Sequence, residues 1–386
     1  MQSTNLNDRI MKDEAKKYST VHYKNYLGLK ELLNAQHLRS AELDEEPAHD
    51  EMLFIIVHQA YELWFKQIIH ELKSVIKLFQ TGNVDERNIG TAIHRLERIV
   101  EIQKLLIEQI RIMETMTPLD FLDFRNHLFP ASGFQSFQFR MIENLLGLEE
   151  KKRLSYNGCP YFTVFAEHRQ KQLKSASEDS SLFDAMETWL ERTPFIQLEE
   201  FDFLDSYKKA VNRMLEKEAK AIRASNYLNE EEKEMRLKML GNTDTYFEAV
   251  LNKEKHNELI EKGELRLSYD ATIATLFINL YRDEPILQLP FQLLTTLVNI
   301  DDALTTWRHR HAQMVLRMLG NKVGTGGSSG HLYLHETSEK HHIFKDLHNI
   351  STLLIPRSEL PILPKSVKRA LGYCCLLYTS PSPRDS

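Results

Sequence analysis

The chain has 386 residues, which is enough for a large hydrophobic core. Apolar residues make up 42% and charged residues 27%, as in an ordinary globular protein. With 49 basic and 55 acidic side chains, the net charge of −6 gives no basic surplus that would favour nucleic acid or an anionic membrane. The longest apolar run, MLFIIV at 52–57, is too short to span a membrane, and no signal peptide is recognised.

Cysteine usage points to a reduced protein without structural disulfides. Cys159, Cys374 and Cys375 form no CxxC pair, no zinc-ligand spacing and no haem-attachment motif. A cytoplasmic location is therefore expected.

Helical periodicity dominates the chain, and the alternating pattern typical of strands is scarce. We expect a flexible N-terminus over 1–19, followed by a single all-α domain over 20–373 with a core helical bundle. Residues 50–80 are apolar nearly all round, which predicts a core helix, and residues 88–116 predict a second helix with one buried face. That face consists of Ile93, Leu96, Val100 and Ile107.

The second half of the chain contains a segment of different composition. Residues 205–265 are rich in charge and in good helix formers, which predicts a charged helical arm on the body. Shorter helices are predicted at 182–193 and 272–284. Residues 374–386 lose the helical pattern and gain Ser and Pro, so we expect them to be disordered and to resemble a non-native tail.

His58 is the first candidate site residue. It lies one helical turn after Phe54 in the predicted core helix, so the imidazole and the phenyl ring share a face. A histidine in this setting can be a structural core residue. It can also be the polar group that orients an aromatic substrate in an apolar pocket.

A short helix is predicted after Thr117. Thr117 is an N-cap, Pro118 fits the first helical position, and Asp120 supplies a carboxylate in the first turn. Pro130 ends the helix at or before Phe129, because the residue preceding a proline avoids the helical conformation.

Arg125 is a guanidinium between apolar neighbours on this short helix. Phe121, Arg125 and Leu128 fall on one face. Arg125 either pairs with a carboxylate of a neighbouring helix or captures a substrate carboxylate through its planar fork.

His311 is the third candidate, on a helix predicted after residue 301. Its apolar face consists of Leu304, Trp307, His311, Val315 and Met318. Such a histidine is most often a hydrogen-bonded core residue. The sharper interpretation is a single axial ligand to haem, which needs one protein nitrogen in an apolar pocket. The later histidines, His335, His341 and His342, lie in polar sequence and are expected on the surface.

The segment GTGGSSG at 324–330 is conspicuous. A phosphate-binding loop needs a lysine that this segment lacks, and this one follows a helix rather than a strand. A flexible connector and a mobile lid remain open, and Thr325 offers the one hydroxyl on a stiffer side chain.

Four motifs together resemble the tryptophan 2,3-dioxygenase family, from about residue 20 to about residue 370. They are HQAYELWFKQ (58–67), DFR with PASGFQS (123–136), WLERTP (189–194) and GTGGSSG. The resemblance implies an all-α cytosolic homotetramer, a dimer of dimers, that binds haem b with ferrous iron in its active form. It further implies insertion of O₂ into the indole ring of L-tryptophan to give N-formylkynurenine, the first step of the kynurenine pathway.

The resemblance also implies roles for individual residues on the haem side. His311 would be the proximal ligand of the haem iron, with Trp307 one turn before it. Ser132 and Gly133 would lie where the chain passes the haem.

On the substrate side, His58 would hydrogen-bond the indole N–H with Phe54 packed beside it. Arg125 would hold the carboxylate of tryptophan. The remaining substrate contacts would be Phe121 and Leu128 around the indole, Thr325 at the head group, and Tyr23 and Tyr26 from a neighbouring subunit. In this interpretation GTGGSSG is a lid over the substrate.

Two other classes of protein are weighed against this one. A helical haem or gas sensor would need His311 and a pocket, but not Arg125, Thr325 and His58 together. A cofactor-free helical interaction module would need none of them for chemistry.

Overall fold

The structure is a computed structural model. It describes residues 20–43, 46–80, 86–154, 160–193, 197–198, 201–320, 322 and 330–371. The expected flexible N-terminus, the expected disordered tail and most of the GTGGSSG segment, Thr325 included, lie outside the described residues.

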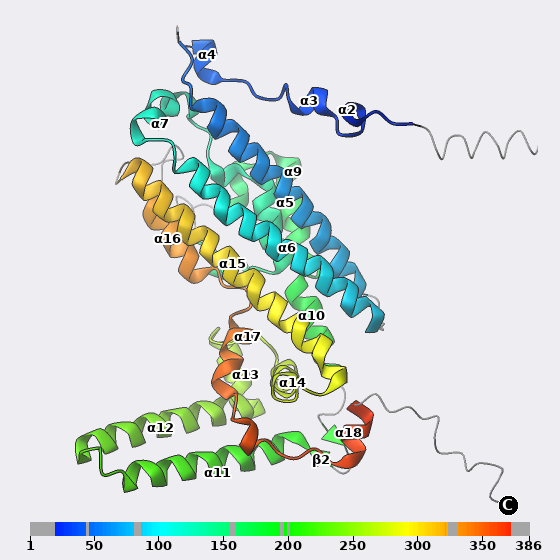
Figure 1. The fold of residues 1–386 in the computed structure, drawn as a ribbon, viewed down its shortest axis with the longest axis vertical. Coiled ribbons are helices and arrows are strands. Elements are labelled where there is room, and N and C mark those ends of the chain that lie inside the picture. The colour runs from blue at the N-terminus through cyan, green and yellow to red at the C-terminus, as the bar shows by residue number, and fades with distance from the viewer. Residues whose placement is uncertain are drawn as a thin grey trace, which may run out of the picture.

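The body of the molecule is a bundle of long helices, as the sequence predicted (Figure 1). Its principal members are α5 (Glu51–Gln80), α6 (Glu86–Met113), α8 (Phe137–Leu146), α15 (Gln288–Leu319) and α16 (His331–Lys340). α6 packs against both α5 and α15, α8 packs on α5, and α16 packs on α15. The candidate residues of α5 and α15 therefore belong to neighbouring parts of one bundle.

Shorter elements complete the described chain. The α-helices are α2 (Tyr23–Tyr26), α3 (Leu29–Leu32), α4 (Arg39–Leu43), α7 (Pro118–Arg125), α9 (Glu167–Glu178), α10 (Leu182–Leu190), α11 (Phe203–Ala224), α12 (Glu230–Leu251), α13 (Lys253–Glu261), α14 (Tyr269–Leu280), α17 (Lys345–Asn349) and α18 (Lys365–Leu371). The 3₁₀ helices are η1 (Asn126–Leu128), η2 (Gly133–Gln135), η3 (Glu150–Lys152), η4 (Tyr161–Val164), η5 (Pro285–Leu287), η6 (Ile350–Leu353) and η7 (Arg357–Glu359). A two-residue antiparallel ladder joins β1 (Gln197–Leu198) to β2 (Phe201–Asp202).

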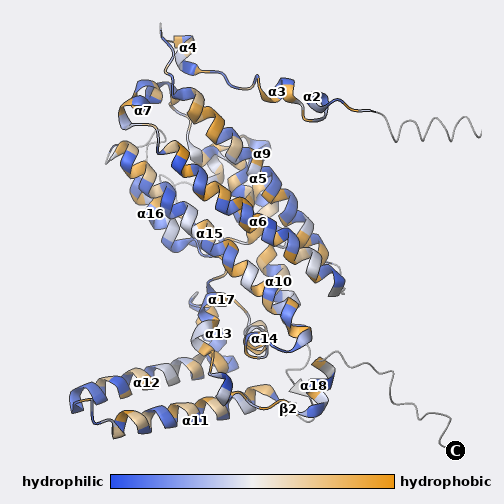
Figure 2. Ribbon diagram, viewed as in Figure 1, coloured by the Kyte–Doolittle hydropathy of each residue, from blue (hydrophilic) through white to orange (hydrophobic). Residues whose placement is uncertain are grey.

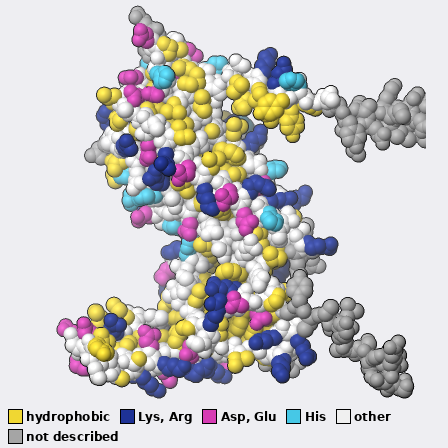
Figure 3. Space-filling model, in the orientation of Figure 1, with side chains coloured by type: hydrophobic (Ala, Val, Ile, Leu, Met, Phe, Trp, Pro, Cys, Tyr) yellow, Lys and Arg dark blue, Asp and Glu magenta, His cyan; other side chains and the backbone are white. Residues whose placement is uncertain are grey.

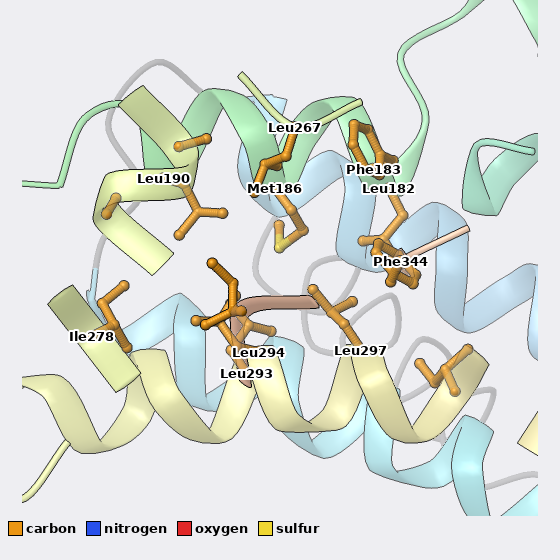
Figure 4. Close-up of a cluster of buried hydrophobic side chains, with 14 of the residues drawn as sticks. Leu182, Phe183, Met186, Leu190, Leu267, Ile278, Leu293, Leu294, Leu297 and Phe344 are labelled. Carbon is orange, nitrogen blue, oxygen red and sulfur yellow. The ribbon is translucent and has the colours of Figure 1, made fainter. Parts of the chain in front are cut away.

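The core continues from the bundle into the layer formed by α10, α14 and α15. Figure 4 shows side chains of α10 pointing toward the leucines of α15 across this layer. The labelled residues are Leu182, Phe183, Met186, Leu190, Leu267, Ile278, Leu293, Leu294, Leu297 and Phe344, and all are buried. Burial of such side chains is the main favourable contribution to folding.

The predicted buried face of α6 is correct except at its end. Ile93, Leu96 and Val100 are buried, but Ile107 is only half-buried. Leu106 and Ile110 are buried in its place. The reason is that α6 lies between α5 and α15, so its buried stripe is wider than a single heptad face.

The predicted start and end of the helix after Thr117 are confirmed. The Thr117 hydroxyl accepts the Asp120 N–H at 3.3 Å, and the Asp120 carboxylate accepts the Thr117 N–H at 2.8 Å, which is a capping box. α7 ends at Arg125, and one turn of 3₁₀ helix, η1, carries the chain to Leu128 before Pro130.

α11 and α12 form a helical hairpin that projects from the body (Figure 1). Hydrophilic and hydrophobic residues are mixed along both helices (Figure 2), because only one side of each has a partner. Tyr207, Leu215 and Phe247 are buried on the inner side. Asn229 starts α12 with a second capping box, to Glu232. The hairpin and α13 occupy most of the residues 205–265 for which the sequence predicted a charged arm.

The N-terminal segment that carries α2 and α3 stands away from the bundle (Figure 1). It is tied to α5 where the Gln59 side chain donates to the carbonyl of Ala35 at 2.9 Å. Hydrophobic side chains gather on its surface (Figure 3). The most exposed of them are Val21, Tyr23, Tyr26 and Leu33. Within the described residues, every helix falls short of the length and apolarity needed to cross a membrane.

Candidate functional site

His58 projects from α5, and its ring orientation is fixed by its own helix. Nδ1 of His58 lies 2.7 Å from the carbonyl oxygen of Phe54, one turn earlier. A carbonyl only accepts hydrogen bonds, so we assign the proton to Nδ1. Nε2 then carries a lone pair and is available as an acceptor for an N–H group of a ligand.

The surroundings of His58 favour the neutral imidazole. Burial by the neighbouring protein lowers the pKa of His58 below 6.5, and the hydrogen bond to Phe54 and the charge of Glu62 offset this only in part. The side chain nevertheless keeps accessible surface. A ligand can therefore reach the imidazole.

An aromatic cluster lies beside His58. The Phe54 ring is 4.1 Å from the imidazole between centroids and is tilted by 34°. Phe121 and Phe124 of α7 lie 5.9 and 5.5 Å from Phe54. Leu128 of η1 packs in the same hydrophobic cluster. The cluster brings together three of the predicted indole-pocket residues, Phe54, Phe121 and Leu128.

Arg125 ends α7 at the edge of this cluster. It follows Phe121 by four residues and is half-buried. The helix that carries it is fixed by the Thr117 cap at one end and by the buried Phe124 side chain at the other. Its guanidinium is thus held on the element that also supplies the aromatic wall, as capture of an aromatic amino acid requires.

His311 and Trp307 form a stacked pair on α15. Their ring centroids are 5.2 Å apart with an interplanar angle of 25°. Burial lowers the pKa of His311 from 6.5 to about 4. His311 is therefore a neutral imidazole at physiological pH, which is the form that ligates a metal.

His58 and His311 lie on different helices that are connected by aromatic contacts: Tyr61 follows His58 on α5, and its ring lies 6.0 Å from the ring of Trp307, which stacks on His311. The sequence could not show this, because 253 residues separate positions 58 and 311. Two neutral histidines, one on α5 and one on α15, with an aromatic cluster beside His58, define the candidate site.

Further aromatic residues, which the sequence did not single out, support the His311 side. Tyr61, Phe65 and Phe139 lie 6.0, 6.5 and 5.2 Å from Trp307 between ring centroids. The Tyr61 hydroxyl donates to the carbonyl of Leu106 at 2.7 Å. Burial raises the pKa of Tyr61 to about 12, while the nearby Trp307 side chain opposes that rise. These contacts fix the indole against which His311 stacks.

A buried cluster of ionic residues behind this layer was also missed. Glu143 is 1% exposed and accepts hydrogen bonds from Arg140, Arg153 and Arg308 at 2.9, 2.7 and 2.9 Å. Burial raises the pKa of Glu143, but the three guanidinium groups outweigh it and hold the pKa well below 4.5. Arg308 lies one turn before His311, so the cluster is next to the site.

One prediction for this region is wrong. His341 is 2% exposed rather than on the surface, because its ring lies 3.7 Å from the Glu143 carboxylate and its backbone carbonyl accepts a hydrogen bond from Arg308. The polar sequence around it forms the end of α16, which folds back over the cluster. His335 is exposed and His342 is half-buried.

These residues fit a haem group. Three arginines surround the single Glu143 carboxylate, so this buried cluster carries surplus positive charge, and haem b carries two negatively charged propionates. Within the described part of the chain, the buried Nε of Arg140 lacks a hydrogen-bond partner. His311 supplies one neutral nitrogen, and the described residues contain no cluster of three metal-binding side chains that would suggest a different metal site.

Ser132 and Gly133 precede α8. The Ser132 hydroxyl accepts the N–H of Phe134 at 3.4 Å and caps η2. A side chain added at Gly133 would meet no atom within 4 Å, so the backbone here borders open space. That is compatible with a bound group passing along this segment.

The structure does not bring every predicted residue to the site. Tyr23 and Tyr26 lie on α2, with 70% and 78% of their surface exposed. Within one chain they stand apart from the bundle that holds His58 and His311 (Figure 1). Thr325 lies outside the described residues, so its predicted contact stays a prediction.

Comparison with known proteins agrees with this geometry. The family model described as tryptophan 2,3-dioxygenase matches residues 11–354. The tryptophan 2,3-dioxygenase of Bdellovibrio bacteriovorus is 52% identical over 357 residues, which cover 92% of this chain and 99% of the relative. Those of Dictyostelium discoideum and Mus musculus are 48% and 47% identical, covering 92% and 88% of this chain and 88% and 83% of the relatives. This all-α chain, matched over nearly its whole length by the family model and by these relatives, belongs to the tryptophan 2,3-dioxygenase family.

Proposed function

We propose that this protein is a haem-dependent dioxygenase of L-tryptophan. It adds both oxygen atoms of O₂ across the C2–C3 bond of the indole ring, which opens the ring and gives N-formylkynurenine. The observation that carries this proposal is the pair of neutral histidines from α5 and α15, with an aromatic cluster and a guanidinium on one side.

His311 would hold the iron of haem b through its neutral imidazole. Its low pKa keeps the lone pair unprotonated, and the stacked Trp307 ring fixes its orientation. Arg140 and Arg308 would balance the negative charge of the propionates, and Ser132 and Gly133 would border the ring. When bound, the haem would supply ferrous iron and with it the oxidative chemistry.

The side chains of α5 and α7 would position tryptophan. Nε2 of His58 accepts the indole N–H, because the proton on the other nitrogen is committed to the Phe54 carbonyl. Arg125 holds the carboxylate by two parallel hydrogen bonds. Phe54, Phe121 and Leu128 enclose the indole and exclude water. Because binding already holds the ring in the reactive orientation, less of the activation free energy has to be supplied in the chemical step.

We further propose that the protein works in the cytoplasm as a homotetramer, a dimer of dimers. The exposed apolar side chains of the N-terminal segment need a partner, and a second copy of the chain supplies one. Tyr23 and Tyr26 would then reach the substrate site of that copy. Thr325 would contact the amino-acid head group when the GTGGSSG lid closes.

Absorption spectroscopy and a turnover assay test the proposal together. The purified protein, supplied with haem, should show a Soret band, and adding L-tryptophan, a reductant and air should produce the absorbance of N-formylkynurenine. Haem binding without turnover would instead indicate a haem sensor, and no haem binding would indicate an interaction module.

A pair of variants assigns the iron ligand. His311→Ala should abolish stable haem binding, measured by the Soret band at equal protein concentration. His309→Ala is the matched control, because His309 is exposed on the same helix and should leave the band unchanged. An unaltered band and full activity in His311→Ala would rule out His311 as the ligand.

A further inference from the structure

Glu62 joins the helix of His58 to the segment that precedes α8. It lies on α5, one turn after His58, and is half-buried. Its carboxylate accepts the Ser136 hydroxyl at 2.6 Å and the Gln138 side-chain amide at 2.8 Å. The same amide of Gln138 lies 2.7 Å from the backbone carbonyl of Glu62. Glu62 thus takes part in three hydrogen bonds with residues that lie 74 to 76 positions later in the sequence.

The partners of Glu62 control the course of the chain from Ser132 to Ser136. Ser136 is the N-cap of α8, and its hydroxyl oxygen accepts the N–H of Phe139 at 3.2 Å. Its own backbone N–H donates to the carbonyl of Gly133 at 3.1 Å. Ser136 therefore ends η2 and begins α8, and fixing its side chain also fixes the backbone at Gly133.

We propose that Glu62 is a positioning residue for the oxidation of tryptophan. It sets the distance between the His58 face of α5 and the 132–136 segment, so that the substrate-binding histidine and the wall of the haem site keep one relative placement. This inference rests on the proposed function, because it assigns His58 to the indole and the 132–136 segment to the haem.

The charge of Glu62 supports the same role. Burial lowers the pKa of His58, and the negative charge of Glu62 raises it by a smaller amount, so the two side chains interact electrostatically. A carboxylate that accepts hydrogen bonds from Ser136 and Gln138 is itself held in place. Ionised acceptors of this kind form stronger hydrogen bonds than neutral ones.

Glu71 provides a comparison on the same helix. It is 4% exposed and accepts hydrogen bonds from Gln67 at 2.7 Å and from Arg98 at 2.6 Å. Its partners lie on α5 and α6 rather than next to the 132–136 segment. Replacing Glu71 should therefore lower stability without a specific effect on the reaction.

The experiment compares Glu62→Gln with Glu71→Gln in the haem-loaded protein. The glutamine at 62 keeps an acceptor for Ser136, but its NH₂ group cannot accept from Gln138. We expect kcat of Glu62→Gln to fall about tenfold, with the KM for tryptophan nearly unchanged, since one hydrogen bond to a charged group is lost. Glu71→Gln should lower the melting temperature and leave kcat near the wild-type value.

Ser136→Ala tests the same hydrogen bond from its donor side. If the two side chains act as a unit, the effects on kcat of Glu62→Gln and Ser136→Ala should be strongly non-additive in the double variant. Because the serine variant keeps the Glu62 charge, it stays informative if Glu62→Gln fails to fold, and it should then lower kcat by itself.

The outcomes separate the two proposals. A wild-type protein that binds haem but does not oxidise tryptophan overturns the proposed function. An active wild type in which Glu62→Gln or Ser136→Ala keeps full kcat, or in which Glu71→Gln loses as much as Glu62→Gln, overturns the role of Glu62. A loss of kcat confined to the Glu62 and Ser136 variants, with the Soret band of the loaded protein retained at wild-type intensity, supports it.

Discussion

Replacing His58 by alanine tests whether the imidazole accepts the indole N–H. The hydrogen bond to Phe54 assigns the proton to Nδ1, so Nε2 can make one neutral hydrogen bond to the substrate. Such a bond contributes about 1 kcal/mol net. Since about 1.4 kcal/mol corresponds to a factor of ten in rate, kcat/KM for tryptophan should fall about fivefold in His58→Ala.

The assay is the formation of N-formylkynurenine from tryptophan and from 1-methyltryptophan, which has no indole N–H. The wild type should prefer tryptophan, and this preference should shrink about fivefold in His58→Ala, because neither substrate then has an acceptor. His94→Ala is the control, since His94 on α6 is 81% exposed and should leave both substrates unaffected.

The pH profile gives a second measurement on the same variant. The pKa of His58 lies below 6.5, and only the neutral ring accepts a hydrogen bond. Wild-type kcat/KM should therefore persist at pH 6.5 and decline only at lower pH, and this decline should be absent from His58→Ala. A preference for tryptophan that keeps its wild-type size in His58→Ala would refute the acceptor role, and a fall in kcat/KM of more than about a hundredfold would indicate proton transfer instead.

Three further predictions concern the carboxylate clamp, the ionic cluster and assembly. Arg125→Lys should raise the KM for tryptophan about tenfold with less effect on kcat, because the ammonium cannot form the two-bond fork, and tryptamine should be a poor substrate of the wild type. Glu143→Gln should lower the free energy of unfolding, measured by urea titration, by about 3–5 kcal/mol, because three buried guanidinium groups lose their counter-charge. The control is Glu101→Gln on the exposed face of α6, which should lower the free energy of unfolding by less than about 1 kcal/mol. The folded pKa of Glu143 lies well below 4.5, so its contribution to stability is fully present above pH 4.5 and is lost as the pH falls from there through the folded pKa. The unfolding curves of the wild type and Glu143→Gln should therefore converge at acid pH. Curves of these two proteins that stay apart there would contradict this assignment. Deleting residues 1–33 should reduce both the oligomer size in light scattering and the activity, and a fully active monomer would show that Tyr23 and Tyr26 take no part.

The sequence alone determined the elements that carry the site. Apolar periodicity identified α5 and α6, and the Thr117–Asp120 cap located the start of α7. It also placed His58 beside Phe54, and His311 one turn after Trp307, because neighbours three or four positions apart on a helix must share a face. These are local relations, which a helix fixes without help from the rest of the fold.

The tertiary structure decided which of these local faces meet. The Tyr61–Trp307 contact that links the helix of His58 to the helix of His311 depends on how α5, α6 and α15 pack, and the spacing of residues along one helix carries no information about the next. The ionic cluster of Glu143 draws its partners from α8, the segment after it and α15, so its members look like ordinary surface charges in the sequence. Glu62 was overlooked for the same reason, because its significance lies in hydrogen bonds to side chains more than seventy positions away. Helical geometry is set by neighbours along the chain, whereas a binding site is set by the packing of helices against one another, and that packing appears only in the folded molecule.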